Sequence, residues 1–568
     1  MIGRRLFLAS TAALYAAAPS LAKAFTSSIG GTREYTISIG EIGVNFTGAP
    51  SRALAVNGQI PGPALRFVDG EDVVIHVTNN LDVMSSIHWH GLLVPPEMDG
   101  VPGISFDGIP PGETFTYRFP IRQTGTYWYH SHSAYQEQQG VYGPLIIEPR
   151  SAEPAPFDRE HTIILSDWLD TDPADVHANL KSMSDYYNYA QRTLGDFLDL
   201  ASDKGLSTAA NERLAWGNMR MTPTDLSDVS GYTFLMNGQT VDKPWFGDMK
   251  PGERVRLRFI NAGAMSYFDI RIPGLKMTVV EADGQAVRPV PVDEFRIAVA
   301  ETYDVIVEPQ DDKAYQITAE ALDRSGFSIG QLGGLQGAPM ILPSPRPRSF
   351  LSMDDMGGDH GNMNHGGMPA ETQIDHAAMG HSMPMATEMD HAAMGHASPM
   401  EMAAPAITRD NEHVPPVDAP AGARVLTYQD LVALEPNDDL RVPDKELTMT
   451  LGGNMERYIW TLNGDKFSEA TPIYLDYGQR VRITYVNDTM MNHPMHLHGM
   501  FVELENGQPP ETRPRKHIVN VGPGRRYSVT FTADEAGEWA FHCHLLYHMA
   551  SGMMSKVVVS RVNAELSQ

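Results

Sequence analysis

Cysteine is almost absent from this chain, since Cys543 is the single cysteine among 568 residues. A lone cysteine cannot form an internal disulfide, so a disulfide framework is excluded. Basic residues are also scarce: 43 lysines and arginines face 70 acidic residues, and the formal net charge is −27. Such a charge argues against nucleic acid as a partner and favours cationic or neutral partners.

Long apolar runs are missing beyond the N-terminus, so the sequence predicts no membrane span. Residues 1–24 differ from the rest, because Arg4-Arg5 precede an apolar run that ends in the small-residue motif Ala22-Lys23-Ala24. This pattern resembles a twin-arginine export signal, with an ordinary secretory signal as the alternative. The twin-arginine route exports folded proteins, so we expect a periplasmic protein that carries a cofactor.

Turn-forming residues are abundant, with 50 glycines and 41 prolines, and alternating apolar strands separate them. One pattern occurs three times: an Asn-Gly turn, a later glycine, and a strand that ends in asparagine nine residues after that glycine. The three strands run over Gly70–Asn79, Gly252–Asn261 and Gly478–Asn487. The sequence therefore predicts an all-β protein of three related β-sandwich domains, at 25–150, 151–345 and 405–568.

Two stretches do not follow this pattern. Residues 185–202 have apolar residues at helical spacing and are predicted to form a surface helix packed on the second domain. Residues 346–404 are predicted to form a linker rich in methionine and histidine. Its part from Ser352 to Met402 contains eleven methionines and six histidines, and the sequence DHAAMGH occurs there twice. That composition cannot bury a core, so we expect disorder.

Histidine pairs of the form His-x-His distinguish the first and third domains from the second. In a strand, the two histidines of a pair face the same side. If the two domains meet through these faces, eight imidazoles converge, which is more than one metal ion accepts. The sequence therefore predicts a metal cluster between the domains, with the ligands His88, His90, His130, His132, His496, His498, His542 and His544.

Cys543 lies between two of these histidines and points to the opposite face of its strand. A thiolate, the imidazole of His548 and the thioether of Met553 are ligands that copper takes in a blue electron-transfer site. His493 supplies the further histidine that such a site needs. The first domain has Ser131 in place of Cys543, so it is predicted to have no equivalent site. The backbone of Cys543 would connect the blue site to the cluster.

The motifs HWHG, HSH, HPMHLHG and HCHLLYHMASGM resemble the four copper motifs of the three-domain multicopper oxidases. The resemblance covers the chain after residue 24 and implies three consecutive cupredoxin-like Greek-key sandwiches. It also implies four copper ions and the reduction of O2 to water. By this resemblance the type 1 copper takes His493, Cys543, His548 and Met553, the type 2 copper takes His88 and His496, one type 3 copper takes His90, His130 and His544, and the other takes His132, His498 and His542.

Asp99 matches an acidic residue that assists the cluster in members of the family, so it is expected to act in catalysis together with Cys543. The alternative is an aspartate that merely forms a turn before Gly100. Many members also have an acid directly after the last type 1 histidine. Here that residue is Met549, which puts a second proton relay in doubt.

The substrate hypothesis rests on the methionine-rich segment, because thioethers select Cu(I) and histidine binds either oxidation state. This segment and residues 216–232 resemble the copper-resistance branch of the family. We therefore expect an exported oxidase of Cu(I), with O2 as acceptor and further Cu(I) bound by the segment. The alternatives are a laccase-like phenol oxidase and a protein that only sequesters copper. A periplasmic copper-binding partner is implied by the branch, and a monomer suffices for the cluster.

Overall fold

The computed structural model describes residues 25–29, 32–189, 191–219, 226–344, 346–347, 351 and 419–561. The export signal predicted at 1–24 lies outside the described residues. So does the stretch 352–418, which contains almost all of the predicted methionine- and histidine-rich linker.

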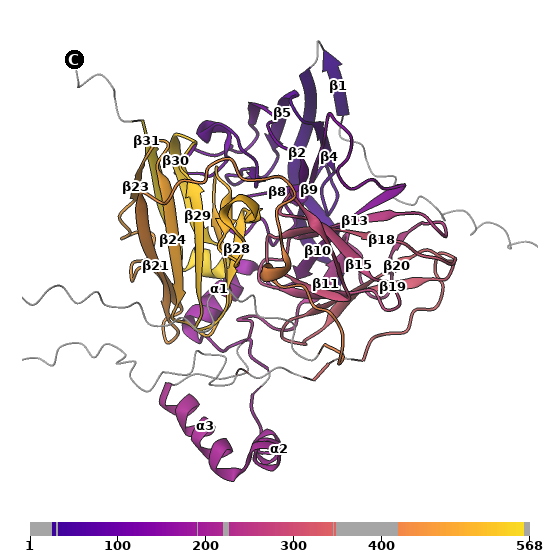
Figure 1. The fold of residues 1–568 in the computed structure, drawn as a ribbon, viewed down its shortest axis with the longest axis vertical. Coiled ribbons are helices and arrows are strands. Elements are labelled where there is room, and N and C mark those ends of the chain that lie inside the picture. The colour runs from indigo at the N-terminus through magenta and orange to yellow at the C-terminus, as the bar shows by residue number, and fades with distance from the viewer. Residues whose placement is uncertain are drawn as a thin grey trace, which may run out of the picture.

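β-strands dominate the described chain and form three sandwiches of two sheets each, which confirms the predicted fold class (Figure 1). The first sandwich joins the sheet β1-β2-β5-β7, with β3 on β2, to the sheet β4-β9-β8-β6. Its strands are β1 (Phe25–Ile29), β2 (Thr32–Val44), β3 (Ser51–Val56), β4 (Leu65–Val68), β5 (Asp72–Asn79), β6 (His88–His90), β7 (Thr114–Pro120), β8 (Gly125–His130) and β9 (Tyr142–Glu148).

The second sandwich pairs the sheet β11-β10-β13-β18-β15-β16 with the sheet β12-β20-β19-β14-β17. Its strands are β10 (Arg159–Trp168), β11 (Thr233–Met236), β12 (Trp245–Gly247), β13 (Val255–Asn261), β14 (Phe268–Arg271), β15 (Met277–Ala282), β16 (Gln285–Val292), β17 (Glu294–Ile297), β18 (Thr302–Val307), β19 (Tyr315–Ala321) and β20 (Phe327–Leu332).

The third sandwich pairs the sheet β22-β21-β24-β29-β26-β27 with the sheet β23-β31-β30-β25-β28. Its strands are β21 (Lys445–Asn454), β22 (Ile459–Leu462), β23 (Ile473–Asp476), β24 (Arg480–Asn487), β25 (His493–Leu497), β26 (Val502–Leu504), β27 (Arg515–Lys516), β28 (Ile518–Val521), β29 (Arg526–Thr532), β30 (Gly537–Cys543) and β31 (Met554–Ser560).

The asparagines that end β5, β13 and β24 perform one structural task in each sandwich. Asn79, Asn261 and Asn487 are buried, and each side-chain amide donates to carbonyls of the loop that follows. Each side-chain oxygen accepts from the backbone N–H two residues further on. The asparagine therefore satisfies the backbone of the loop that leads to the next strand. In the first and third sandwiches that next strand, β6 or β25, carries the histidines.

The helices that the structure describes are short. They are α1 (Pro173–Ser182), α2 (Leu194–Lys204), α3 (Leu206–Met219) and α4 (Leu546–Ala550), with 3₁₀ turns at Pro96–Met98, Tyr428–Asp430 and Pro510–Thr512. None of the helices within the described ranges is long and apolar enough to cross a membrane.

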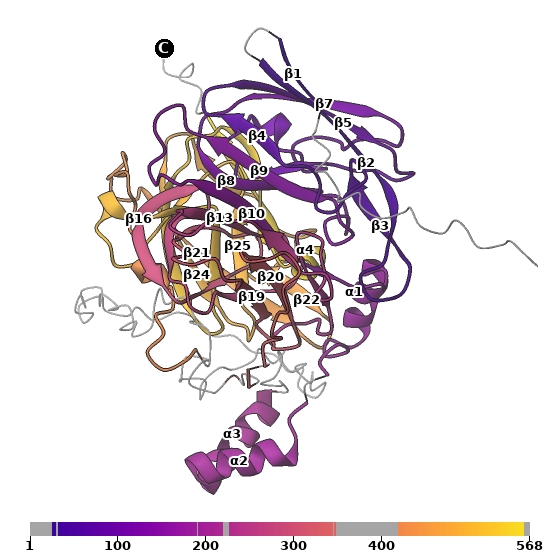
Figure 2. The ribbon, with the colours of Figure 1, turned by 90° about the vertical axis from the view of Figure 1, so that its right-hand side faces the viewer.

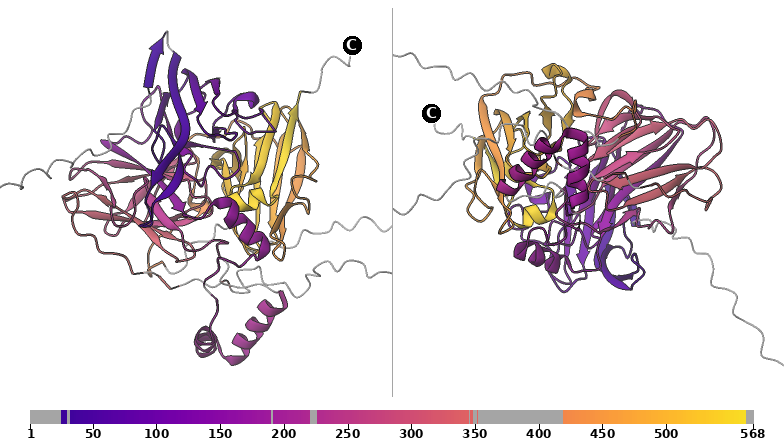
Figure 3. Two further views of the ribbon diagram at one scale, coloured as in Figure 1. Left: turned by 180° about the vertical axis from the view of Figure 1, so that it is seen from behind. Right: turned by 90° about the horizontal axis from the view of Figure 1, so that it is seen from below.

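The helix predicted at 185–202 begins later than expected, at Leu194, because Thr193 caps it through a capping box with Asp196. The predicted packing is wrong. α2 buries none of its residues and pairs with α3, and the two helices stand apart from the sandwiches (Figures 1 and 3).

The segment 419–440 leads into the third sandwich along the edge of the second. Val425 bridges to Glu294, and Ala433 bridges to Val287. The segment that leads to the third sandwich is thus held on the second by backbone pairing. In Figure 2 the strands of the first sandwich lie above those of the second and third, and α2 and α3 lie at the opposite end of the molecule.

Candidate metal centre

Four strands bring the eight predicted cluster histidines together. In the first sandwich β6 pairs with β8, so that His88 lies opposite His130. In the third, β25 pairs with β30, so that His496 lies opposite His542. Seven of the eight histidines are at most 3% exposed, and His132 is half-buried.

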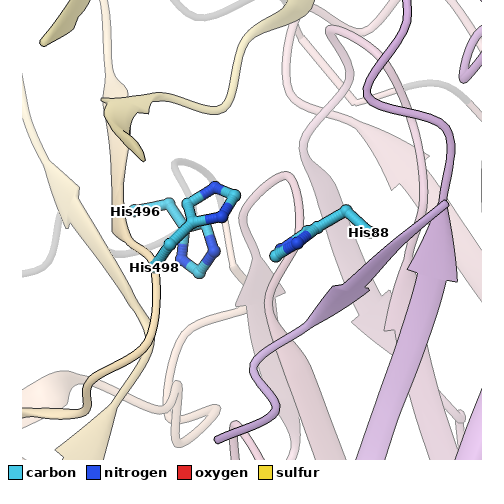
Figure 4. A group of neighbouring side chains, drawn as sticks. All are labelled: His88, His496 and His498. Carbon is cyan, nitrogen blue, oxygen red and sulfur yellow. The ribbon is translucent and has the colours of Figure 1, made fainter. Parts of the chain in front are cut away.

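The histidines fall into groups whose ring nitrogens lie within 4.8 Å of one another. The two groups predicted for the type 3 coppers both occur: His90 with His130 and His544, and His132 with His498 and His542. His88 and His496, predicted for the type 2 copper, form a further group with His498. Figure 4 shows His496 and His498 on the third sandwich facing His88 on the first.

Hydrogen bonds orient the rings so that their free nitrogens face inward. Nδ1 of His88 bonds to the carbonyl of Asp99 at 2.7 Å, and Nδ1 of His496 bonds to the carbonyl of His517 at 2.7 Å. The Nε2 atoms of both rings have no protein partner. Nδ1 of His542 likewise bonds to the carbonyl of Cys543 at 2.9 Å. Each carbonyl therefore fixes the tautomer that leaves Nε2 with a lone pair for a metal.

The inward nitrogens crowd one another in a way that only a cation relieves. Nε2 of His542 lies 3.0 Å from Nε2 of His498 and 3.4 Å from Nε2 of His132. Burial lowers the pKa of His132 and His498 well below the usual value and that of His542 to about 4. The rings are thus neutral imidazoles that meet at one point, a donor set that fits copper.

The predicted second site forms around Cys543 on the opposite face of β30. Its Sγ lies 3.5 Å from Nδ1 of His493 and 3.7 Å from Nδ1 of His548, and these two nitrogens are 3.1 Å apart. Met553 is fully buried, and its carbonyl accepts from the N–H of Cys543. Burial raises the pKa of the Cys543 thiol well above its usual range, so a bound metal is what would hold the thiolate.

Models of the multicopper oxidase family match three parts of this chain, at residues 38–152, 159–331 and 441–563. The chain belongs to the multicopper oxidase family. It is therefore an oxidoreductase whose cofactor is copper, and both groups of donors found here suit that metal.

This multicopper oxidase is similar to copper resistance proteins over most of its length. It is 50% identical over 556 residues to a copper resistance protein A homolog of Pseudomonas syringae pv. tomato, covering 93% of this chain and 92% of the relative. It is 49% identical over 576 residues to copper resistance protein A of Escherichia coli, covering 95% and 94%.

Solved structures of multicopper oxidases share the fold. Fet3p, described as a multicopper oxidase that functions in iron import, superposes with a TM-score of 0.65 at 20% identity, covering 93% of this chain and 90% of that one. A metallo-oxidase from Campylobacter jejuni gives 0.60 at 20% identity, covering 95% and 94%.

Asp99 reaches the cluster of this multicopper oxidase with its side chain. It is fully buried, and Oδ2 accepts from Nδ1 of His498 at 2.8 Å, while Oδ1 lies 3.3 Å from Nδ1 of His88. Asp99 thus touches one ligand candidate from each sandwich, a placement that a simple turn aspartate would not need.

Glu137 is a second buried carboxyl beside the histidines, and no sequence motif pointed to it. Its Oε2 lies 2.7 Å from Nδ1 of His130, and Oε1 is 4.0 Å from Nδ1 of His544. Burial raises the pKa of Glu137 well above its usual range, and the charge of Asp167 adds to this. Glu137 lies on the turn after His132. Because it falls outside the His-x-His motif, the motif did not indicate its role.

Two polar residues hold the rings of the Cys543 site from behind. The hydroxyl of Thr489 lies 2.7 Å from Nε2 of His493, and Oδ2 of Asp228 accepts from Nε2 of His548 at 2.7 Å. Asp228 is fully buried on the second sandwich and also accepts from Tyr458. Sequence reasoning missed Asp228, because nothing along the chain places residue 228 beside residue 548.

The first sandwich carries a polar counterpart of the Cys543 site. Ser85 occupies the position of His493, since each lies six residues after the asparagine that ends the preceding strand. In the next motif, Ser131 and Gln136 occupy the positions of Cys543 and His548. Both hydroxyls donate to Oε1 of Gln136, at 2.7 and 2.9 Å. Hydrogen bonds between these side chains thus fill the place that the three ligand candidates occupy in the third sandwich.

Five histidines belong neither to the predicted ligands nor to the methionine-rich segment, and lone histidines of this kind are usually structural. His76 bonds to Thr116 and Glu34, His161 to the carbonyl of Asp248, and His177 to Tyr135 and Ser551. His413 lies outside the described residues. His517 differs, because it is 2% exposed, neither ring nitrogen has a hydrogen-bond partner, and it contacts the cluster. Burial lowers its pKa to about 4.

Proposed function

We propose that this multicopper oxidase acts in copper resistance by oxidising Cu(I) to Cu(II) with O2 as electron acceptor. The names of its two relatives at 50% and 49% identity support the biological role. The observation that carries the choice of substrate is a sulfur-lined pocket beside His493, which is described below.

The ligand groups support four copper ions in the predicted arrangement. The type 1 ion would be held by His493, Cys543, His548 and Met553, and the other three by the eight histidines between the sandwiches. When bound, these ions accept single electrons from the substrate and reduce O2 to water.

Cys543 connects the two groups of ligands covalently. Its backbone leads directly to His542 and His544, and its carbonyl also accepts the hydrogen bond from Nδ1 of His542 at 2.9 Å. An electron delivered to the thiolate therefore has a short path of bonds to both type 3 ligand sets.

A pocket of about 30 Å³ lies near His493 and is lined in part by Met455, Met490 and Met491. Thr489 also lines it and contacts Nε2 of His493. The pocket has room for a water-sized ion. Thioethers are soft donors that select Cu(I), and the exposed carboxylate of Asp488 at the rim adds attraction for a cation. The chain's formal charge of −27 also attracts cations.

Reduction of O2 consumes protons, and Asp99 is the carboxyl placed to supply them. Its oxygens contact Nδ1 of His498 and lie near Nδ1 of His88, which places a carboxyl for proton transfer beside two ligand candidates. Glu137 contributes by accepting from His130 and keeping the inner nitrogen of that ring free.

We also propose that the protein works in the periplasm after export by the twin-arginine route, as a monomer that receives Cu(I) from a copper-binding partner. The predicted signal and the methionine-rich linker support this, and both lie outside the described residues. The domain limits 25–150, 151–345 and 405–568 are part of the same proposal.

The substrate pocket is tested by changing Met490 and Met491 to leucine, which conserves volume but removes both sulfur donors. We expect the KM for Cu(I) to rise about tenfold, with the blue absorption and phenol turnover unchanged. Steady-state O2 uptake measures this. Met277→Leu, a buried methionine of the second sandwich, is the matched control. An unchanged KM for Cu(I) in the double variant would contradict the proposal that Cu(I) binds in this pocket.

A further inference from the structure

We propose that His177 is a positioning residue for the type 1 copper, because it fixes Ser551 in the loop that joins His548 to Met553. This inference rests on the proposed type 1 site and adds a residue outside its set of ligands. His177 lies on α1, between β10 and β11 of the second sandwich. Its side chain reaches the third sandwich, where Nε2 lies 2.7 Å from Oγ of Ser551.

The loop at residues 549–552 sets the position of Met553 relative to His548 through backbone hydrogen bonds. The N–H of Met553 donates to the carbonyl of His548 at 3.0 Å. The N–H of Ser551 donates to the same carbonyl at 3.2 Å and to that of Tyr547 at 3.0 Å. Ser551 and Met553 are thus tied to one carbonyl, so a displacement of Ser551 also disturbs the separation of the two ligands.

The turn at Gly552 leaves this loop little freedom to adjust. Gly552 has φ +120°, and a Cβ there would lie 2.6 Å from Cβ of Lys466 and 2.8 Å from the carbonyl oxygen of Trp460. The position therefore requires glycine. The N–H of Trp460 also donates to the carbonyl of Ser551, at 3.3 Å. The strand β22 thus holds the main chain of the loop, and His177 holds the side chain of Ser551.

Both ring nitrogens of His177 have partners, and the residue is only 6% exposed. Nδ1 lies 2.5 Å from the hydroxyl of Tyr135, which is on the turn 133–140 of the first sandwich. Burial lowers the pKa of His177 to about 4, so near pH 7 the ring is neutral and offers one donor and one acceptor. Hydrogen bonds to the first and third sandwiches therefore fix the orientation of this imidazole.

Packing alone does not explain a histidine at this position. Val176 and Leu180 already bury the apolar side of α1, and an apolar residue at position 177 would avoid the cost of burying an imidazole. Apolar contacts are not directional, whereas a hydrogen bond specifies both a distance and a direction. The imidazole of His177 therefore provides what an apolar side chain would not, a fixed position for the hydroxyl of Ser551.

The ring of His177 also lies close to two tyrosines that adjoin His548. Its centroid is 5.8 Å from that of Tyr547 and 6.2 Å from that of Tyr458. Tyr547 directly precedes His548, and Tyr458 donates to Asp228, which accepts from His548. His177 is therefore packed beside the surroundings of one type 1 ligand and hydrogen-bonded to the loop that leads to the next.

Loss of the imidazole would leave the buried hydroxyl of Ser551 without this partner. The loop at 549–552 would then be held less firmly, and Met553 would lie further, on average, from the other type 1 ligands. The axial thioether tunes the reduction potential of a blue copper site. A weaker thioether contact is expected to raise that potential.

The test compares variants of the copper-loaded protein. His177→Phe keeps a ring but removes both nitrogens, and Ser551→Ala removes only the hydroxyl. In each we expect a higher type 1 potential, an altered copper hyperfine splitting in electron paramagnetic resonance, and loss of the blue absorption at a 10- to 100-fold lower chelator concentration. The double variant should show no further change, because both substitutions break one contact. His177→Gln keeps a donor and an acceptor and should retain most of the native properties.

His161→Phe, which removes a histidine bonded to the carbonyl of Asp248, is the matched control, and the type 3 absorption of each sample reports whether the fold is intact. A native potential and spectrum in Ser551→Ala, or additive changes in the double variant, would overturn the role of His177. Absence of blue absorption from the unaltered protein would instead contradict the type 1 site itself. Ser551→Ala loses a single hydroxyl, so it decides the question even if His177→Phe fails to fold.

Discussion

At the scale of single residues, the site depends on side chains that hold the ligands as much as on the ligands themselves. Each ring of the Cys543 site turns one nitrogen inward and bonds the other to a fixed partner, Thr489 for His493 and Asp228 for His548. The ligand positions followed from the sequence because a strand alternates its faces every residue. Asp228 did not, because it comes from another sandwich.

Asp228 provides a prediction at this scale. Asp228→Ala removes the acceptor for Nε2 of His548 and for Tyr458. The imidazole then donates less electron density, so we expect the type 1 reduction potential to rise and copper retention to fall 10- to 100-fold. A redox titration of the blue band and a chelator titration measure these changes. Asp228→Asn keeps an acceptor, so its reduction potential and copper retention should lie between those of the unaltered protein and of Asp228→Ala. An unaltered potential in Asp228→Ala would show that the contact does not tune the site.

At the scale of elements, one turn of the first sandwich, residues 133–140, contacts three places. Gln136 fills the polar counterpart of the Cys543 site, Glu137 meets His130, and Gln138 accepts from Tyr547 next to His548. The sequence could not reveal this, because only folding brings the turn against the third sandwich. The same turn thus orients one cluster ligand and supports the neighbour of a type 1 ligand.

Glu137→Ala should affect the type 3 coppers in particular. It leaves Nδ1 of His130 with a weaker partner, the carbonyl of Ser131 at 3.0 Å. We expect 10- to 100-fold weaker copper retention, measured by the type 3 absorption during chelation. Glu137→Gln retains an acceptor and should preserve most of the binding. Gln139→Ala on the same turn is the control. Equal losses in the alanine variants at 137 and 139 would mean that the turn, and not the carboxyl, is what matters.

At the scale of the whole molecule, the second sandwich contains none of the predicted ligands but holds both sites in place. Asp228 reaches His548, and Asp283 fixes the backbone around His517. The three-sandwich fold and the convergence of the histidine pairs were predictable, since turn and strand periods are local properties of the sequence. The division of the histidines into metal groups came from the resemblance to the multicopper oxidases. Contacts such as Asp228 with His548 were not, because they depend on how whole sandwiches pack.

The methionine-rich segment gives a prediction at the same scale. Deleting Ser352–Met402 should reduce turnover of Cu(I) several-fold more than turnover of a phenol, because the deletion removes soft donors that concentrate Cu(I) near the oxidase. A glycine-serine segment of equal length is the matched control, and O2 uptake with each substrate is the measurement. Equal rates with Cu(I) before and after deletion would show that the segment does not deliver substrate.

The most direct test of the central claim is the stoichiometry of Cu(I) oxidation by the copper-loaded protein and by Cys543→Ser. We predict four Cu(I) oxidised per O2 consumed, without release of hydrogen peroxide, and loss of both the blue absorption and O2 uptake in Cys543→Ser. Two Cu(I) per O2 with peroxide released, or O2 uptake that persists without the Cys543 thiolate, would contradict an electron path from the cysteine site to a cluster between the sandwiches.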